Sequence, residues 1–324
     1  MLSRPAYSQR KRLIAVGAVC TSTIYRVATI PTVPAKVLAS QACRVVDGMA
    51  ISAACAFVKL GGQASVWARV GDDVQGSDMR SALLAEGLDV SGLHTVPGTA
   101  SSHVAVVVDA QGQRLVVPFH DPNIDNSPDW LPLAALRQAD MVHCDARWAA
   151  GAEAALMAAS VLGLPRMIDG DVAPRKVLSR LVPLATHAVF SDVGLLDYTG
   201  ATCVETALLH IAAGHAGHVG ASCGADGYCW VEDGKIQQVD SPVVKVVDTL
   251  AAGDIFHGAF ALALLEGKTV AAAARFACVA AALKCTRFGG RLGCPSRLEV
   301  DTFLAEQLLV GNIALEAETP KTCY

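Results

Sequence analysis

Several features that would assign this 324-residue sequence to other classes of protein are missing. It has no long basic run and carries a net charge of −4, so nucleic acid is not expected as its main partner. No apolar run reaches transmembrane length without charged or polar breaks, so no membrane association is expected. The eleven cysteines are scattered and include no CxxC pair, and reduced thiols in a cytoplasmic protein are the simplest interpretation.

Two common nucleotide-binding motifs are also missing. No Walker A string occurs, because the nearest candidate, Gly234-Lys235-Ile236, does not match it. No GxGxxG follows the first predicted strand, so a dinucleotide-dependent dehydrogenase remains only a third alternative, which NAD bound after purification would revive. With 52% hydrophobic and 17% charged residues, the chain can bury the core of one large α/β domain or two smaller ones.

The N-terminus resembles a signal peptide only at first sight. Arg10-Lys11-Arg12 precedes an apolar run at 13–20, but this run is short, polar residues 21–23 end it, and no small-x-small cleavage site follows. We therefore expect residues 1–12 to form a flexible tail and residues 13–20 to form a first buried strand.

From residue 139 onward, predicted strands and helices alternate. Strands are expected at 141–145, 166–169, 188–191 and 218–222, and helices at 151–162, 174–184 and 203–213. Such alternation predicts right-handed crossovers and a parallel sheet covered on both faces, with ligands at the carboxyl ends of the strands. Polar residues stand at those ends, namely Asp145 to Trp148, Asp169 to Asp171, Ser191-Asp192 and Ser222 to Gly227. Several polar strand ends in register predict a cleft.

Two extended segments lie far apart in the sequence. Residues 24–46 are rich in Val, Thr and Pro, and the apolar runs 103–108 and 113–117 flank a turn that contains Gly112. We expect the two segments to pair as a small separate sheet. The alternative is an ordinary hairpin at the edge of the main sheet.

The stretch 246–260 joins a short β-branched run to a long apolar run of helical length. We expect a strand that turns through Ala251-Ala252-Gly253 into a helix, leaving several N–H groups and the positive end of the helix dipole aimed at one spot. That spot suits a phosphoryl group in flight. Asp254, in the first helical turn, can take a proton from an attacking hydroxyl. The alternative is an ordinary acidic residue at a helix start.

The string Asp248-Thr249-x-Ala251-Ala252-Gly253-Asp254, followed by an apolar helix, resembles the signature of the ribokinase (PfkB-type) carbohydrate kinases. Members of that family carry Gly or Ala at the position of Ala251, and the resemblance covers most of residues 13–295. It implies an α/β ribokinase-like domain at 13–310, with a central, mainly parallel sheet and helices on both faces. It also implies a small β lid, from segments at about 22–46 and 98–120, and a C-terminal tail at 311–324.

The resemblance implies an ATP- and Mg²⁺-dependent sugar kinase that forms a homodimer through the lid. Asp254 would be the general base, and the backbone N–H groups from Ala251 through Ala252 and Gly253 to Asp254 would form the anion hole. The loop from Ser222 to Gly227 resembles the family's Thr-x-Gly-x-x-Gly nucleotide loop, although a hairpin turn into 228–231 is the alternative. The implied nucleotide contacts are Ser191, Ser222, Gly224, Gly227, Thr249 and Lys284.

Two metal positions follow from the same resemblance. Where the family commonly has Asn-x-x-Glu, whose Glu holds magnesium through water, this chain has Ser191-Asp192-Val193-Gly194. Asp192 is therefore the candidate for Mg²⁺. Asp248 is the candidate for holding a monovalent cation such as K⁺, as in relatives.

On the sugar side, residues 48–62 predict a helix of small residues capped by Gly61, similar to the family's N-terminal signature. Asp47-Gly48 replaces the usual Gly-Gly, and Ser52 stands where Asn is usual, so Gly48 and Ser52 are candidate sugar contacts. The family's sugar-binding Asp aligns with Ser22, a third candidate, and an Asn expected on the second lid strand aligns with Pro118.

Three strings resemble the sulfofructose kinase branch of the family, namely Asp145-x-Arg147-Trp148, Asp169-Gly170-Asp171 and residues 282–291. That branch phosphorylates the C1 hydroxyl of a ketose whose far end carries a sulfonate. The match suggests Lys36 and Arg147 as contacts for such an anion. A nucleoside kinase of the same fold and a catalytically silent sugar- or nucleotide-binding regulator remain alternatives, although the intact Asp254 argues against the regulator.

Overall fold

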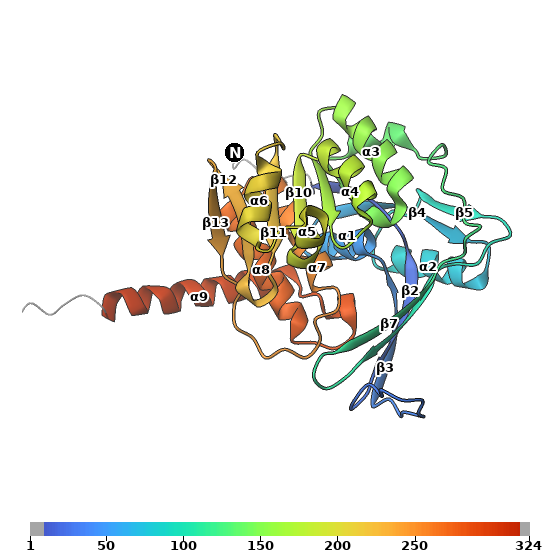
Figure 1. Ribbon diagram of the computed structural model, residues 1–324, viewed down its shortest axis with the longest axis horizontal. Coiled ribbons are helices and arrows are strands. Elements are labelled where there is room, and N and C mark those ends of the chain that lie inside the picture. Colours follow the sequence, from blue (N-terminus) through green and yellow to red (C-terminus); the bar gives the residue numbers. More distant parts are fainter. Residues whose placement is uncertain (1–9, 318–324) are drawn as a thin grey trace, which may run out of the picture.

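The computed structural model describes residues 10–317, so most of the expected N-terminal tail and the end of the C-terminal tail lie outside it (Figure 1). The main sheet has nine strands in the order β13-β12-β11-β10-β9-β8-β1-β4-β5. In that order the strands are β13 (Lys235–Val239), β12 (Tyr228–Glu232), β11 (His218–Ser222), β10 (His187–Ser191), β9 (Arg166–Gly170), β8 (Met141–Cys144), β1 (Arg12–Val16), β4 (Gln63–Gly71) and β5 (Leu93–Val96). All pairs from β11 to β5 are parallel, and β12 and β13 are antiparallel additions at one edge.

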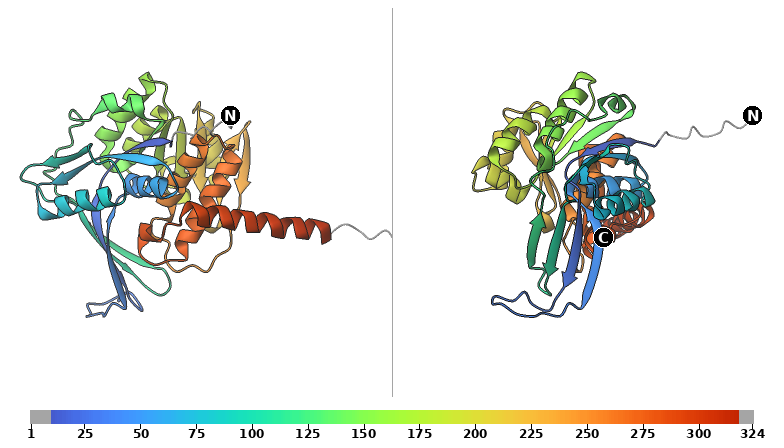
Figure 2. Two further views of the ribbon diagram at one scale, coloured as in Figure 1. Left: turned by 180° about the vertical axis from the view of Figure 1, so that it is seen from behind. Right: turned by 90° about the vertical axis from the view of Figure 1, so that its right-hand side faces the viewer.

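Helices cover both faces of this sheet, as the strand–helix alternation predicts (Figure 2). The helices are α1 (Met49–Lys59), α2 (Val74–Ala85), α3 (Ala149–Val161), α4 (Arg175–Leu181), α5 (Asp192–Thr199), α6 (Val204–Ala212), α7 (Ala252–Leu265), α8 (Val270–Cys285) and α9 (Arg297–Ala317). Short 3₁₀ turns are η1 (Leu133–Gln138), η2 (Ala146–Trp148), η3 (Val182–Leu184), η4 (Gly224–Asp226) and η5 (Gly290–Gly293). Helix α9 extends past residue 310, where we expected the tail to begin.

The sheet separates two hydrophobic cores. In β1, Leu13 and Ala15 pack in one core with α1, α7 and α8, whereas Ile14 and Val16 pack in the other with α3 to α6. Because successive side chains of a strand point to opposite faces, a strand buried on both faces needs a continuous apolar run, and residues 13–16 provide it. Helix α7 packs between α1 and α8, which explains why residues 255–263 are buried around its whole circumference.

The two extended segments do pair as a separate four-stranded sheet, in the order β3-β2-β6-β7, and do not form an edge hairpin of the main sheet. Its strands are β2 (Cys20–Arg26), β3 (Gln41–Asp47), β6 (His103–Val108) and β7 (Arg114–Phe119). Strands β2 and β6 pair in parallel although about eighty residues separate them. This lid projects from the body of the molecule beside the start of α7 (Figures 1 and 2).

Two of the expected strands are wrong: one is shorter than expected and the other is absent. The strand expected at 13–20 ends at Val16, and the chain enters the lid at Cys20. A side chain at Gly17 would collide with the carboxyl group of Asp145, so the backbone at this exit lies directly against that side chain. The strand expected at 246–247 does not form. The N–H groups of Val247 and Asp248 instead donate to the Cys285 carbonyl, at 2.8 and 3.1 Å, so this segment is fixed by the end of α8.

Candidate active site

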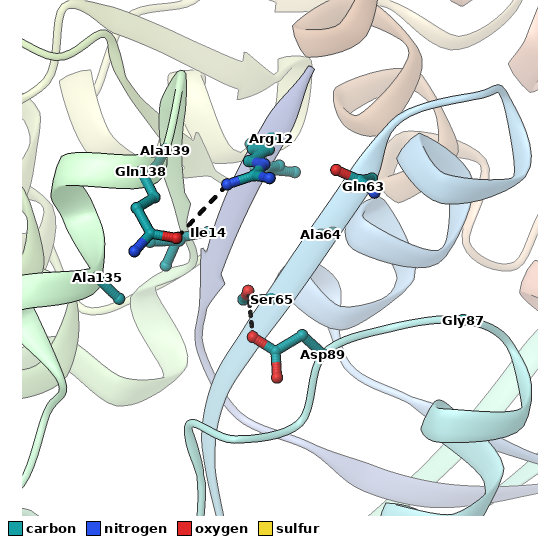
Figure 3. Close-up of a pocket in the computed structure, with 11 residues that line it drawn as sticks. Arg12, Ile14, Gln63, Ala64, Ser65, Gly87, Asp89, Ala135, Gln138 and Ala139 are labelled. Carbon is teal, nitrogen blue, oxygen red and sulfur yellow. Dashed lines mark hydrogen bonds between the residues drawn. The ribbon is translucent and has the colours of Figure 1, made fainter. Parts of the chain in front are cut away.

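A cleft of about 690 Å³ opens at the carboxyl ends of the parallel strands, between the start of α7 and the segment 241–249. Most of the residues that the sequence analysis named as candidates for the nucleotide and phosphoryl sites line this cleft. Those that line it are Ser191, Asp192, Ser222, Gly224, Gly227, Thr249, Ala251, Ala252, Gly253 and Asp254. A smaller cavity of about 280 Å³ lies at the amino ends of the strands, where β1 and β4 begin (Figure 3). None of the predicted site residues lines that second cavity.

The start of α7 has an unusual backbone. Ala251, the residue before the helix, adopts a left-handed conformation with φ of 64°, which a small side chain tolerates better than a bulky one. The N–H of Ala252 donates to the Thr249 carbonyl at 3.3 Å, so it is turned away from the expected anion hole. Within residues 10–317, the N–H groups of Ala251, Gly253 and Asp254 have no such partner. The donors available to an anion are therefore fewer than the sequence suggested.

Asp254 lies in the first turn of α7 and is half-buried at the cleft. Burial raises the pKa of its carboxyl group well above the ordinary value, and the negative charges of Asp169, Asp47, Asp171 and Asp145 raise it further. Asp254 therefore lies near four further acidic residues, of which Asp169 and Asp171 also line the cleft. Such a concentration of negative charge favours the binding of protons, cations or hydroxyl groups that donate hydrogen bonds.

Asp47, at the end of β3, is a site residue that our sequence reasoning missed. Its carboxylate accepts hydrogen bonds from the Ser22 hydroxyl at 3.1 Å, the Ser52 hydroxyl at 2.6 Å and the Gly48 N–H at 3.0 Å. Ser52 is fully buried, so it acts on a ligand only by holding Asp47. The three expected sugar contacts thus all hold one carboxylate. The signal in the sequence was the replacement of the first Gly of the usual Gly-Gly pair by Asp47.

Asp145 follows β8 and is completely buried. It accepts the N–H of Ala50, in the first turn of α1, at 3.1 Å and the N–H of Arg147 at 2.8 Å. Burial raises the pKa of this carboxyl group to about 6 despite these bonds. Asp145 therefore fixes the start of α1 against the end of β8, which positions the neighbouring Arg147.

The two predicted anion contacts are placed differently. Arg147 lies at the edge of the cleft, where its guanidinium is 3.3 Å from the carboxylate of Asp171, a cleft-lining residue. Its side chain is 44% exposed, so the guanidinium is accessible to a ligand. Lys36 lies in the exposed loop 27–40 between β2 and β3, and no residue in the described part of the chain forms a hydrogen bond or ion pair with it. In the described part of the chain, Lys36 forms no contact with Arg147 and does not line the cleft.

The loop from Ser222 to Gly227 connects the antiparallel strands β11 and β12, as the hairpin alternative expects, and it also lines the cleft. Gly227 has φ of 88°, and a side chain there would collide with the Val239 carbonyl. The Ser222 hydroxyl donates to the Phe190 carbonyl at 3.4 Å. Ser191 caps α5 by accepting the Gly194 N–H at 3.0 Å, and it donates to Asp171 at 3.0 Å.

Gly194 has a structural reason for carrying no side chain. A Cβ at this position would collide with the carbonyl oxygen of Gly170, where β9 ends. Asp192 is two residues earlier and faces the cleft, with one carboxylate oxygen accepting the Val193 N–H at 2.8 Å. Its second oxygen can meet a hard cation such as Mg²⁺, so the available residues fit a magnesium ion at Asp192.

Asp248 and Lys284 do not fit their expected roles. Asp248 is buried, and its carboxylate accepts the N–H groups of Leu250, Gly289 and Gly290 at 2.8 to 3.0 Å. The Lys284 ammonium, also fully buried, donates to the Asp248 carbonyl at 2.6 Å and lies 3.5 Å from its carboxylate. Lys284 therefore does not line the cleft, and its ammonium occupies the surroundings of Asp248 that a monovalent cation would need. The residues present do not fit K⁺.

Comparisons with known proteins agree with this geometry. Residues 10–297 match the pfkB family of carbohydrate kinases. The chain is 26% identical over 308 residues to the ribokinase of Haemophilus influenzae, covering 91% of this chain and 99% of that protein. It is 26% identical to the fructokinase of Vibrio alginolyticus, covering 80% and 91% respectively. A solved structure from Agrobacterium tumefaciens, provisionally named a ribokinase, is 40% identical with a TM-score of 0.89 over 92% of this chain and 99% of that one.

None of the helices in the described part of the chain is long and apolar enough to cross a membrane. The nine-stranded sheet, the separate lid and the cleft at the start of α7 form the ribokinase-like fold that the sequence predicted. Since the family match covers nearly the whole described chain, this protein belongs to the pfkB family of carbohydrate kinases.

Proposed function

We propose that this chain transfers the γ-phosphoryl group of ATP to a sugar hydroxyl, and that Asp254 accepts the proton of that hydroxyl. One observation carries the proposal: the Asp254 carboxyl lies in the cleft in the same helical turn as the unpartnered N–H groups of Gly253 and Asp254, judged over residues 10–317. One turn of helix thus offers a base for the attacking hydroxyl and hydrogen-bond donors for the transferred anion. The dipole of the 14-residue helix α7 adds to the effect.

The cleft residues from the strand ends suit the nucleotide. Gly224 and Gly227 allow close approach of a ligand to the backbone, and the side chains of Ser191, Ser222 and Thr249 supply hydroxyl groups nearby. Asp192 would hold Mg²⁺ beside the phosphates. Mg²⁺ bound with the nucleotide supplies positive charge that neutralises the phosphates and the surrounding carboxylates.

Asp47 is the best candidate for holding the sugar. An ionised carboxylate has roughly four positions for accepting hydrogen bonds, and Ser22, Ser52 and Gly48 use three of them. The remaining position can accept a sugar hydroxyl, so we propose that Asp47 makes the contact that relatives make from the position of Ser22. Asp47→Asn should then raise KM for the sugar at least tenfold, and an unchanged KM would remove this role.

We propose further that the sugar is a ketose with an anionic group, such as sulfofructose. Arg147 supports this idea, because its exposed guanidinium lies at the cleft edge and is paired only with Asp171 among the described residues. Lys36 would have to approach with the loop 27–40, because in this structure it makes no polar contact within the described chain. A charge-assisted bond contributes roughly 1.5–3 kcal/mol, which corresponds to about ten- to a hundredfold in affinity.

The test compares charged and neutral sugars. Arg147→Ala should raise KM about ten- to a hundredfold for the anionic sugar and leave KM for its neutral analogue nearly unchanged. Arg180→Ala serves as the control, because Arg180 forms a similar exposed ion pair with Glu153. Equal losses on both sugars, with a lower Tm, would show that Arg147 only braces the fold through Asp171.

A coupled ADP-release screen over ketoses, sulfosugars, sugar phosphates and nucleosides identifies the acceptor. Phosphorylation of nucleosides alone would make the chain a nucleoside kinase of the same fold. Absence of ADP with every acceptor, at concentrations where ATP and sugar bind, would make it a silent regulator and would overturn the proposal.

We also propose that two copies pair through the lid. Because directly paired strand residues point to the same face, the lid face opposite Ile24, Val106 and Val108 carries the exposed side chains of Tyr25, Leu115, Val117 and Phe119. Val117→Glu should convert a dimer to a monomer in light scattering, whereas Val161→Glu, at an exposed position of α3, should not.

The described cysteines are all free thiols, which suits a reducing compartment such as the cytoplasm.

A further inference from the structure

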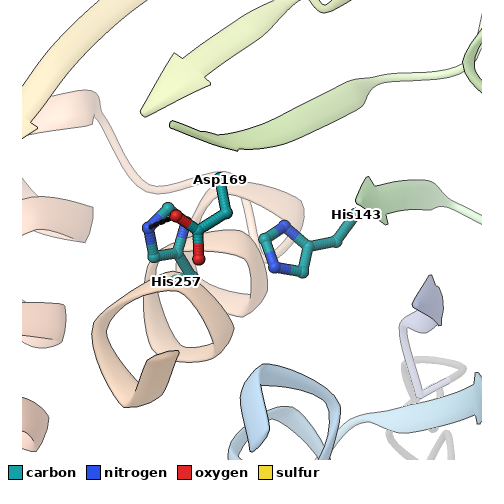
Figure 4. A group of neighbouring side chains, drawn as sticks. All are labelled: His143, Asp169 and His257. Carbon is teal, nitrogen blue, oxygen red and sulfur yellow. Dashed lines mark ion pairs between the residues drawn. The ribbon is translucent and has the colours of Figure 1, made fainter. Parts of the chain in front are cut away.

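Three side chains from three different elements meet beneath the floor of the cleft. His143 comes from β8, Asp169 from the end of β9 and His257 from α7, and each is at most 3% exposed. One ligand atom from each residue lies within 4.8 Å of the other two. Figure 4 shows the carboxyl group of Asp169 pointing between the two imidazole rings.

These groups are buried without the hydrogen bonds that buried polar atoms need. Among the described residues, neither ring nitrogen of His143 has a partner, and Nδ1 of His257 has none either. Leaving a buried donor or acceptor unpaired costs about 1–3 kcal/mol, so such groups are rare in folded proteins. A buried imidazole with neither ring nitrogen paired, beside a buried carboxyl group, indicates that something absent from the chain itself, such as a bound ion, satisfies His143.

The charge state of the two imidazole rings suits a metal ion. Burial, followed by the neighbouring His257, lowers the pKa of the His143 ring well below its ordinary value, so the ring is neutral and keeps a lone pair. Burial likewise lowers the pKa of His257 to about 4. Burial raises the pKa of Asp169 to about 8, so binding of a metal ion would release the proton of this carboxyl group. Two neutral imidazoles and the resulting carboxylate form a ligand set that zinc commonly takes in proteins, whereas Mg²⁺ prefers oxygen ligands alone.

The spacing of two of the three ligand atoms fits as well. His257 Nε2 and Asp169 Oδ1 are 3.5 Å apart. Bonds of about 2.0–2.2 Å at tetrahedral angles place two ligand atoms of one zinc ion roughly 3.3–3.5 Å apart. Asp169 and His257 also line the cleft, so an ion can reach them from it.

We propose that His143, Asp169 and His257 bind one divalent transition-metal ion, with Zn²⁺ as the best match. This site is distinct from the Mg²⁺ position at Asp192, because it lies on β8, β9 and α7 and contains nitrogen ligands. The ion would lie one helical turn along α7 from Asp254 and would link the start of that helix to β8 and β9. It would thereby stabilise the elements that position the active-site carboxylates, whether or not the proposed sugar transfer is correct.

The test measures metal binding directly on the full chain. Protein stripped with a chelator should bind about one equivalent of Zn²⁺ in calorimetry, and the ion should raise Tm. Co²⁺ should give the intense visible absorption of a tetrahedral ion. His143→Gln and His257→Asn should each weaken Zn²⁺ binding at least as much as the loss of a group that only orients a ligand, which costs about 10- to 100-fold. His187→Gln, which alters a largely buried histidine at the start of β10, is the matched control and should bind like the wild type.

Absence of zinc binding in the folded wild-type protein would overturn the proposal. Binding that is unchanged in both His143→Gln and His257→Asn, but disappears when thiols are blocked, would place the ion on cysteines and would also overturn it. Circular dichroism of each variant shows whether it is folded. If one histidine variant fails to fold, the other variant and the Co²⁺ spectrum of the wild type still show whether the histidines bind the ion.

Discussion

Gly253 offers a test in which stability and activity should change in opposite directions. A Cβ built at this position meets no atom of the described protein within 4 Å, and the residue lies in the first turn of α7. Replacing Gly by Ala in a helix is favourable by about 0.5–1 kcal/mol when nothing collides. Gly253→Ala should therefore raise Tm by about 1–3 °C.

The same methyl group should impair phosphoryl transfer. Gly253 lines the cleft beside Asp254, and its N–H is one of the free donors at the start of α7, so a phosphoryl group bound there would meet the new Cβ. A displacement of about 1 Å from the reactive position can cost about 10²-fold in rate. We expect Gly253→Ala to lower kcat by about that factor, and Gly253→Val to abolish transfer while the protein stays folded.

The assay pairs thermal melting with coupled ADP release. Gly258→Ala is the contrasting control, because a Cβ at Gly258 would collide with the Ala53 carbonyl of α1 and should destabilise the fold by about 1–3 kcal/mol. If Gly253→Val retained full activity with a normal Tm, the phosphoryl group could not lie against the start of α7, and the proposed anion site would be wrong.

Further predictions concern the base and the buried ion pair. Asp254→Asn should lower kcat by about 10²–10⁴-fold and leave the ATP dissociation constant nearly unchanged; a loss of only a few-fold would remove Asp254 as the base. Because a base acts in its deprotonated form and the pKa of Asp254 in the free protein is raised, kcat/KM should fall with decreasing pH around a midpoint above that of an ordinary Asp. A midpoint near 4 in the pH–rate profile would contradict this. Turnover should be the same in potassium and in tetramethylammonium salts, since Lys284 contacts Asp248. Lys284→Met should cost about 3–5 kcal/mol in denaturant unfolding, because it leaves the buried Asp248 carboxylate without its cation.

Local sequence patterns were sufficient wherever neighbouring residues decide the structure. The alternation of apolar strands and helical stretches after residue 139 predicted β8 to β11 and helices α3, α4 and α6 within a few residues. The small residues at 251–253 predicted the turn into α7, because only small side chains fit a left-handed backbone at the start of a helix. Hydrophobic burial and backbone sterics act over a few residues, so the sequence carries them directly.

The expected strand at 246–247 shows where this local reasoning ends. β-branched residues favour strands, but a strand needs a free sheet edge, and the N–H groups here bond to the end of α8 instead. The neighbouring Asp248 also looked like a cation ligand until the fold placed Lys284 beside it, thirty-six residues away. In both cases the deciding partner is distant in the sequence.

The sequence by itself determined the family, the order of the elements and the position of Asp254 at the start of α7. Only the tertiary structure brought Ser22 and Ser52 onto Asp47, and only it brought His143 and His257 together around Asp169. A lone Asp or His in a sequence carries no sign of what will surround it. Its hydrogen bonds and its pKa depend on burial and on charges contributed by distant strands and helices, and these exist only once the chain has folded.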